Sequence, residues 1–333
     1  MKTKQPGFVL VMALFVIALG SIFVTSLLQR AVSYDRLHRV LLKQQQARML
    51  ALNGIEIARA QLSNPLTLEK EKNPVDQNIV PFLYVDQVQT FSLTTDKEGL
   101  NGEIKLFITS EEGKINLNKL YNFEEKKYLV DKDNDAQKNI ALLNEPIHKN
   151  FGIENFDQIL NQLLQKKPLE DVTQLINKTF KGTLFKDLDA VEKGQVALTD
   201  LFTLASPNNQ LQPLYLSNSL SNILQLEKQE LSKEKRLEIV KKMGALKGQI
   251  QWQQQWKELL APLYKKEYTG IPDVIKKSLA SKIETTAFLV ISYGKVDGGH
   301  STQVVQKVCA YLEKVNIPET KTILYTVKRL YWL

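Results

Sequence analysis

Residues 8–28 read FVLVMALFVIALGSIFVTSLL, and no charged side chain separates Lys4 from Arg30. An apolar stretch of about twenty residues is long enough to cross a bilayer as one helix. A cleaved secretory signal would have a shorter apolar core followed by small residues, whereas here the small residue Gly7 precedes the apolar stretch. The sequence therefore predicts a transmembrane helix over 8–28 behind a short polar leader, residues 1–7.

The helical pattern continues past this predicted span. No proline occurs between Gly7 and Asn64, and Ser63-Asn64-Pro65 then ends the helix because proline cannot continue it. One helix over 8–62 would be roughly 80 Å long at 1.5 Å per residue. We expect its second half to pack on a globular domain through an apolar stripe with steps of three and four residues. The stripe consists of Tyr34, Leu37, Leu41, Met49, Leu52, Ile55, Ala58 and Leu62, with Gln45 interrupting it.

Positive charge is concentrated near the predicted span. Residues 1–62 hold eight Lys or Arg against Asp35 and Glu56, whereas the remaining residues are close to neutral. A near-neutral globular part argues against a nucleic-acid surface, and the basic excess suits anionic headgroups or acidic partners. More Lys and Arg residues follow the predicted span than precede it, which by a literal count places the C-terminal domain in the cytoplasm. Long domains can cross the membrane regardless of the flanking charges, however, so the charges leave the orientation of the span open. The single cysteine, Cys309, permits no intrachain disulfide.

The rest of the chain predicts strands, then helices, then strands again. Residues alternate between apolar and polar in the first strands, and short helical segments rich in Leu, Gln and Lys fill about 119–283. The first predicted strands are Gln89–Thr94 and Glu103–Ser110, and a turn at Glu111–Lys114 leads into a returning strand, Ile115–Asn118. The last predicted strands are Thr286–Tyr293, Val304–Leu312 and Thr322–Leu333. A hairpin turn at Asp297-Gly298-Gly299 joins the first two of these. The predicted helices are Asn155–Leu164, Ser219–Gln225, Ser232–Met243 and a segment from Trp252 through Trp256 to Leu260.

This order predicts an α+β fold, in which a long N-terminal transmembrane and amphipathic helix packs on an antiparallel sheet that carries a large inserted helical domain. The predicted boundaries are a leader at 1–7, a transmembrane helix at 8–28, the first part of the sheet domain at 29–118, the helical insertion at 119–283 and the last strands at 284–333.

The sequence carries no recognisable catalytic motif. G-x-S-x-G, Walker A and dinucleotide-binding patterns do not occur, the three histidines are scattered, and one cysteine cannot build a zinc site. Asp131-Lys132-Asp133-Asn134-Asp135 spaces its acidic residues like the first ligands of an EF-hand. Ala136 stands where Gly is needed, however, and Leu142 where the bidentate Glu belongs. A solvated acidic loop and a different kind of calcium site both stay open. Calcium is therefore the only cofactor to consider.

Gly7 followed by Phe8 and a long apolar helix resembles the signal of type IV pilins and of the pseudopilins of type II secretion systems. A prepilin peptidase cuts that signal after the glycine. Most of these subunits carry Glu at the fifth mature position, which is Met12 here. The large minor pseudopilins of the K type, at the pseudopilus tip, lack this Glu and are similar to this chain in length. The segments Glu111–Asn118 and Leu198–Thr203 also resemble that type II secretion family.

The resemblance implies cleavage between Gly7 and Phe8, N-methylation of Phe8, and Met12 as a marker of the tip position. It implies a structural subunit that is not an enzyme, a pilin-like fold, and a role in initiating pseudopilus assembly and supporting the export of folded proteins. The implied partners are other minor pseudopilins through the N-terminal helix, the prepilin peptidase, the inner-membrane assembly platform and secreted substrates, with no nucleic acid. The implied location is the inner membrane, single-pass, with the C-terminal domain in the periplasm.

Two alternatives to this interpretation remain. One is a minor pilin of a type IV pilus, serving adhesion or DNA uptake. The other is a signal-anchored membrane protein of unrelated function, for example an enzyme or a receptor, whose N-terminus is not cut. The insertion of K-type pseudopilins can bind calcium, but the acidic pattern at 131–135 is too loose to assign ligands.

Overall fold

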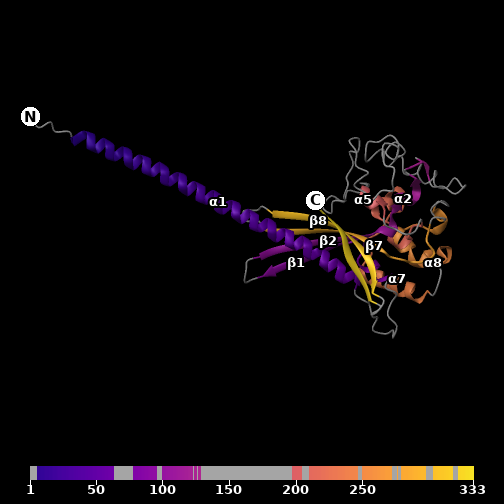
Figure 1. The fold of residues 1–333 in the computed structure, drawn as a ribbon. Coiled ribbons are helices and arrows are strands. Elements are labelled where there is room, and N and C mark those ends of the chain that lie inside the picture. Colours follow the sequence, from indigo (N-terminus) through magenta and orange to yellow (C-terminus); the bar gives the residue numbers. More distant parts are fainter. Residues whose placement is uncertain are drawn as a thin grey trace, which may run out of the picture.

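The computed structural model describes residues 6–63, 78–95, 100–122, 124–125, 127–128, 197–204, 210–246, 250–271, 276, 279–297, 303–317 and 322–333. In these residues the protein is α+β. One long helix, α1 (Pro6–Ser63), lies across an antiparallel sheet and projects far beyond it (Figure 1). The predicted combination of a long apolar N-terminal helix with an antiparallel sheet is therefore confirmed.

The sheet contains five strands in the order β1-β2-β7-β8-β9, and every neighbouring pair is antiparallel. All five strands were predicted, and the turn at residues 298–299 lies outside the described residues. In β2 and β7, Ser110 lies opposite Phe288, so the chain leaves the sheet and returns at the same place. We call the residues between these two strands, 111–286, the insertion. The strand bounds are β1 Val88–Thr95, β2 Leu100–Ser110, β7 Ala287–Asp297, β8 Gln303–Ile317 and β9 Thr322–Trp332.

The segment directly after β2 differs from the prediction. The 3-10 turn η2 (Glu111–Gly113) leads into β3 (Ile115–Asn116) and α2 (Leu117–Leu120). The prediction of a returning strand was wrong, because β3 does not run back along β2. It pairs in parallel with β6 (Phe202–Thr203) instead. The physical reason lies in the sheet: β1 and β7 occupy both edges of β2, which leaves no backbone groups for a further partner.

The described part of the insertion consists mainly of short helices. Three of the predicted helices are present as α6, α7 and α8, and the predicted helix at 155–164 lies outside the described residues. Ser217 and Ser232 cap α6 and α7 by accepting hydrogen bonds from Leu220 N and Lys235 N. A small antiparallel pair, β4 (Tyr121–Asn122) and β5 (Lys127–Tyr128), precedes them. The helix α7 packs on the 3-10 turn η1 (Val80–Leu83), which precedes the sheet. The bounds of the helices and 3-10 turns are α5 Leu198–Leu201, η4 Pro213–Tyr215, α6 Asn218–Ile223, α7 Lys233–Ala245, α8 Trp252–Leu259, α9 Ala261–Tyr264 and η5 Tyr268–Gly270.

The hydrophobic core joins the second half of α1, one face of the sheet and the insertion helices. Ile55, Leu106, Phe288 and Trp256 belong to this single cluster. Successive strand residues face opposite sides of a sheet. The opposite side therefore carries a second buried cluster, which consists of Phe107, Leu289, Ile291, Tyr293 and Cys309.

Small residues bring α1 into direct contact with the sheet. A Cβ atom on Gly54 would lie 2.0 Å from Ser292 Oγ, and one on Gly294 would lie 1.9 Å from the Ala47 carbonyl oxygen. Ala51 on the same face of α1 is fully buried. Helix and strand backbones can approach this closely only where side chains are absent or short, so Gly and Ala define the packing face of α1.

The predicted stripe on α1 was therefore only partly correct. Ile55, Ala58 and Leu62 are buried, as expected. Tyr34, Leu37 and Leu41 are exposed because they lie before the part of α1 that packs on the sheet, where every residue from Phe8 to Leu42 except Ser26 is exposed. Met49 and Leu52 are exposed because they lie on a different face from the alanines and glycine that contact the sheet. We call these exposed residues the outer stripe: Tyr34 (71% exposed), Leu37 (55%), Leu41 (48%), Met49 (64%) and Leu52 (37%).

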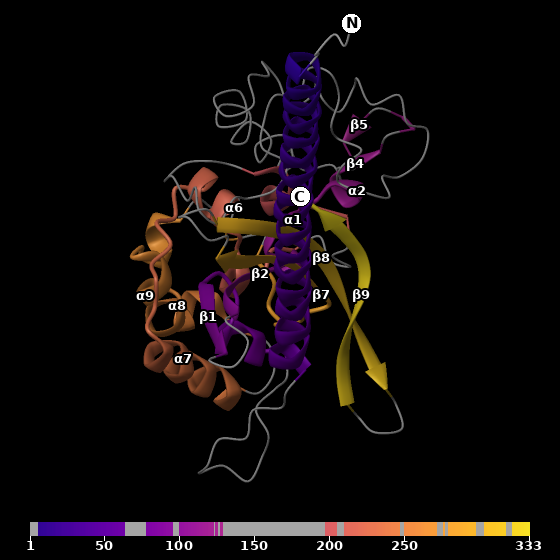
Figure 2. The same cartoon turned by 90° about the vertical axis from the view of Figure 1, so that its left-hand side faces the viewer.

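Polar contacts tie α1 to the rim of the sheet. The guanidinium of Arg48 lies 4.2 Å from the ring centroid of Trp332, and Arg59 Nε donates to the Tyr325 carbonyl oxygen at 2.8 Å. Both partners belong to β9, at the edge of the sheet (Figure 2). Lys43 Nζ donates to the Asp297 carbonyl oxygen of β7 at 2.8 Å. These contacts fix the direction in which the free half of α1 projects.

Candidate functional site: the protruding half of α1

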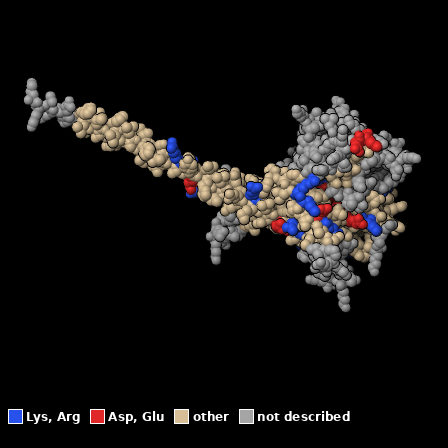
Figure 3. All heavy atoms as spheres, viewed as in Figure 1, with Lys and Arg blue, Asp and Glu red and all other residues tan. Residues whose placement is uncertain are grey.

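The first half of α1 projects from the globular part, and residues 8–28 of it carry no charged side chain. From Phe8 to Leu42 every residue is exposed except the half-buried Ser26. The space-filling view shows neither basic nor acidic side chains along its first part (Figure 3). By its length and apolar composition α1 could cross a membrane.

The sequence-predicted site residues lie at the free end of this rod. Gly7 is in the first turn of α1, and Phe8 and Met12 follow it one turn apart, 64% and 51% exposed. Figure 1 shows this end of the chain far from the sheet. The peptide bond between Gly7 and Phe8 is thus remote from the globular part, where another protein could reach it.

Residues 29–46, which we call the neck, connect the predicted span to the sheet, where Ala47 is the first fully buried residue. The neck is helical throughout and carries both apolar and basic side chains that are exposed. Asp35 and Arg39 form an ion pair at 2.9 Å with side chains 56% and 73% exposed, which contributes little stability. The neck is therefore a continuous helical extension of the predicted span that also carries charged residues.

The two internal segments singled out in the sequence meet in space. β3, within Glu111–Asn118, pairs with β6, within Leu198–Thr203, through Ile115 opposite Phe202 and Asn116 opposite Thr203. In the second segment, Asp200 Oδ2 accepts a hydrogen bond from Ser219 N at 2.8 Å, and Asp200 is buried. The segments thus form one small structural unit at the base of the insertion.

A buried carboxylate joins the two ends of the insertion. Glu112 Oε1 accepts hydrogen bonds from Thr286 N at 2.5 Å and Ala287 N at 3.2 Å, and also from Thr286 Oγ1. Glu112 Oε2 accepts from Ser110 Oγ at 2.7 Å. Burial raises the pKa of Glu112, and the hydrogen bonds from Thr286 and Ser110 oppose that rise. Sequence reasoning missed this role, because the partners of Glu112 lie far away along the chain.

Buried charges attach the insertion helices to the segment before β1. Lys228 Nζ lies 2.5 Å from Asp86 Oδ2, and Arg236 Nη1 donates to the carbonyl oxygens of Phe82 and Val85 at 2.8 and 2.9 Å. Burial lowers the pKa of Lys228, and the carboxylate of Asp86 opposes that shift. These contacts hold the insertion against the sheet domain at a second place, away from Glu112.

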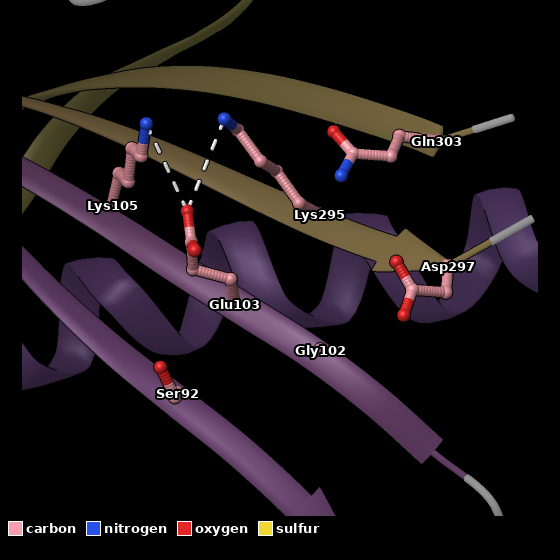
Figure 4. A pocket seen from close by; sticks show the side chains of 7 residues that line it. All are labelled: Ser92, Gly102, Glu103, Lys105, Lys295, Asp297 and Gln303. Atoms are coloured by element: carbon pink, nitrogen blue, oxygen red, sulfur yellow. Dashed lines mark ion pairs between the residues drawn. The ribbon is translucent and has the colours of Figure 1, made fainter. Parts of the chain in front are cut away.

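A shallow polar hollow of about 280 Å³ lies at the rim of the sheet (Figure 4). Figure 4 shows the Glu103 carboxylate directed between Lys105 and Lys295, with an oxygen 3.9 Å from each ammonium nitrogen. Opposite charges face each other here, and the lining contains no histidine or cysteine that could act as a base or nucleophile. The hollow is lined by Ser92, Gly102, Glu103, Lys105, Lys295, Asp297 and Gln303.

Within the described residues, no group of three or more His, Cys, Asp or Glu side chains could hold a metal ion. The candidate calcium segment at 131–135 lies outside the described residues. No protein-family model matches the chain, and no curated protein matches its sequence. The function proposed below therefore rests on the residues and geometry given above.

Proposed function

We propose that the chain is a structural subunit of a type II secretion pseudopilus, a K-type minor pseudopilin that initiates assembly at the tip and supports the export of folded proteins. The observation that carries the proposal is that α1 is one continuous helix. Its exposed apolar half follows Gly7-Phe8, and its other half packs on an antiparallel sheet. A helix that only anchors a domain needs no rigid connection to it. A filament subunit does, because its helix must hold the domain at a fixed angle.

In this proposal α1 and the five-stranded sheet form a pilin-like domain, and residues 119–283 form a helical domain within the insertion. Support comes from the pairing of β2 with β7, which brings the two ends of the insertion together at Ser110 and Phe288. Glu112 reinforces that junction through Thr286 and Ala287. The free half of α1 would cross the inner membrane, with the globular part in the periplasm.

The proposed maturation uses the accessible end of α1. Gly7 has no Cβ atom, so a peptidase can fit closely around the bond to Phe8. Cleavage there would create a new ammonium on Phe8, followed by its N-methylation. An ammonium is costly to bury among apolar helices unless a carboxylate pairs with it. Met12 offers no carboxylate to a neighbouring subunit but packs well among apolar groups, which suits a subunit with neighbours on one side only.

Intact-mass measurement on the full chain, extracted from cells that contain a prepilin peptidase, tests the proposal. We expect loss of residues 1–7 and addition of one methyl group. Gly7→Val should block cleavage. Gly20→Ala should not, because a Cβ at Gly20 meets nothing within 4 Å. A mature protein that retains Met1 to Gly7 would contradict the proposal and favour an ordinary signal anchor.

A second measurement addresses the tip position. Met12→Glu should leave co-purification with the other minor pseudopilins unchanged or weaken it, because the new carboxylate has no partner in hydrocarbon. The variant is compared with Met12→Leu, which keeps the apolar character. Tighter binding of the Glu variant with unchanged stoichiometry would show that the terminal-subunit argument is wrong.

A further inference from the structure

The five-stranded sheet has two edge strands, β1 and β9, and β9 is protected against pairing with a further strand. It carries Lys328 and Arg329 side by side, and both are exposed. Its register against β8 shifts next to Tyr311. Arg59 of α1 also donates to the carbonyl oxygen of Tyr325, which occupies a backbone acceptor of this strand. Charged residues and an irregular register are the features that keep edge strands from pairing with other chains.

The other edge strand, β1, lacks these protections. Its sequence, VQTFSLTT, contains no charged residue and no proline, and its register against β2 is regular over all eight residues. Among the described residues no strand pairs with its outer edge, and Figure 1 shows β1 at the lower margin of the sheet. Alternate residues of an edge strand direct their N–H and C=O groups away from the neighbouring strand. The outer edge of β1 is therefore a regular template for a further strand.

The two faces of β1 define the side chains that an added strand should carry. On the face away from α1, Thr90 and Ser92 are exposed and lie opposite Lys105 and Glu103 of β2, which already face each other. A charged side chain beside β1 would find no partner of opposite charge in that strand. On the face toward α1, Leu93 is 39% exposed, so an apolar side chain could pack beside it.

The direction of β1 restricts where the added strand comes from. Lys43 contacts Asp297 at the end of the sheet where β1 ends, and Gln61 Nε2 donates to Gln89 Oε1 at 2.7 Å near the start of β1. The strand therefore runs opposite to α1. Two copies that paired this edge about a two-fold axis would have antiparallel β1 strands, and their α1 helices would point in opposite directions. Copies anchored in one membrane through α1 cannot pair in this way, and the protected β9 disfavours pairing of β1 with β9 of a second copy.

We propose that the outer edge of β1 is a strand-addition site for an extended segment of a different protein. The segment has about eight residues, roughly 27 Å at 3.4 Å per residue, and is uncharged where it contacts β1. It places small polar side chains beside Thr90 and Ser92 and apolar ones beside Leu93. In this mode of recognition the main-chain hydrogen bonds supply affinity, and alternate side chains supply selectivity. The inference rests on the proposed membrane anchor, which excludes a second copy, but not on the pseudopilin assignment.

Site-specific photo-crosslinking of the full chain in its native membrane tests the site. A photoreactive residue is placed in turn at Val88, Thr90 and Ser92, which are exposed and lie on one face of β1 at steps of two residues. Leu330, which is 40% exposed on β9, is the control position. We expect the three β1 positions to react with one short segment of one protein, and Leu330 to give at least several-fold less of that adduct.

The register of the adducts is the decisive readout. For every two-residue step of the crosslinker along β1, the modified residue of the partner should also move by two residues, always in the same direction. Strand pairing produces this pattern, and random collision does not. Adducts that scatter over several proteins, or that do not move in register, would overturn the inference. So would adducts with a second copy of this chain, or no protein adduct at all.

A matched pair of variants gives a second readout, because lysine on an edge strand opposes pairing. Leu93→Lys should reduce the adduct from Thr90 at least tenfold, whereas Leu330→Lys, at a position of similar exposure on β9, should leave it nearly unchanged. Equal reduction by both variants would contradict the site. Chemical denaturation checks that each variant is folded, and Ser92→Lys, on the opposite face of β1, replaces Leu93→Lys if the latter does not fold.

The N-terminal mass, measured on the same membranes, separates this inference from the proposed function. A retained leader combined with adducts in register refutes the pseudopilin assignment but supports the strand-addition site. A processed N-terminus without adducts in register refutes the strand-addition site alone.

Discussion

The two halves of α1 are both rich in apolar residues but use them in different ways. In the half that packs on the sheet, small residues make the closest approaches, and Ala47, Ala51 and Ala58 are fully buried. The larger Ile55 and Leu62 are buried beside them. In the protruding half, large residues such as Phe8 and Leu41 are exposed. Close packing of a helix on a sheet requires short side chains at the contact, whereas lipid or another helix can accommodate long ones.

The comparison shows that apolarity alone does not reveal where a helix packs on a sheet, because the closest approaches need small residues at particular positions. A side chain at Gly54 or Gly294 would push the backbones apart, because atoms of Ser292 and Ala47 already occupy that space. The same side chain on the protruding half meets no such restriction. The following predictions test this difference, from the largest expected effect to the smallest.

Gly294→Val should have the largest effect, because its Cβ would lie 1.9 Å from Ala47 O and 2.6 Å from Ala51 N, which are backbone atoms. We expect the free energy of unfolding to fall by about 3 kcal/mol or more. Gly270→Ala is the control, since the nearest atom to its Cβ would be Lys266 Cε at 3.7 Å. Chemical denaturation of the full chain in detergent measures both. Equal stability of the two variants would mean that α1 does not contact the sheet this closely.

Glu112→Ala should lower the free energy of unfolding by about 2 kcal/mol, because it leaves buried donors of Thr286, Ala287 and Ser110 without an acceptor. Glu112→Gln should cost about 1 kcal/mol or less, since the amide oxygen can keep the Oε1 contacts and the amide nitrogen can donate to Ser110. The same denaturation experiment compares them. If both variants were equally unstable, the charge of Glu112 would matter more than its acceptor position.

The pH dependence of stability gives a further test at the same residue. Burial raises the pKa of Glu112 in the folded protein above its ordinary value of 4.5. The folded state therefore holds the proton more tightly than the unfolded state, and this contribution to stability is fully present below pH 4.5 and is lost as the pH rises through the folded-state pKa. The difference in unfolding free energy between the native protein and Glu112→Gln should thus decrease as the pH is raised. A difference that grows with pH would show that the hydrogen bonds outweigh burial.

Arg48→Ala should have a smaller effect, about 0.5–1 kcal/mol, because it removes a cation–π contact with Trp332 at the edge of the sheet. Arg36→Ala, on the exposed neck, is the matched control and should change little. Hydrogen exchange in β9 should also become faster in the Arg48 variant only. Unchanged exchange there would mean that Arg48 does not hold β9 against α1.

Leu41→Gln should have almost no effect on the stability of the isolated chain, within about 0.5 kcal/mol, because Leu41 is 48% exposed and is not packed on the sheet. Ala51→Leu, ten residues later on the same helix but fully buried, should by contrast destabilise the protein by overpacking. Parallel denaturation of the two variants provides the measurement. A large loss of stability for Leu41→Gln would show that the neck packs on the globular part.

Much of the fold followed from patterns in the sequence. The helix end near Ser63 was predictable from Pro65, and the five strands of the sheet from alternating residues and turn signals. The prediction failed at Ile115–Asn118, where local pattern could not reveal that β1 and β7 already occupy both edges of β2. The roles of Gly54 and Gly294 were also missed. A glycine within a regular element signals a close approach only when the opposing backbone is known.

The sequence by itself determined the continuous helix, its apolar first half and the antiparallel strands, because these follow from local composition and periodicity. It also contains the residues on which the proposals depend: Gly7 and Phe8 for maturation, and Met12 for the tip position. Only the tertiary structure decided which face of α1 meets the sheet, and that Glu112 joins the two ends of the insertion. Helical periodicity places side chains on faces, but it cannot say which face another part of the chain will cover. That depends on how closely two backbones can approach, and on contacts between residues far apart in the sequence.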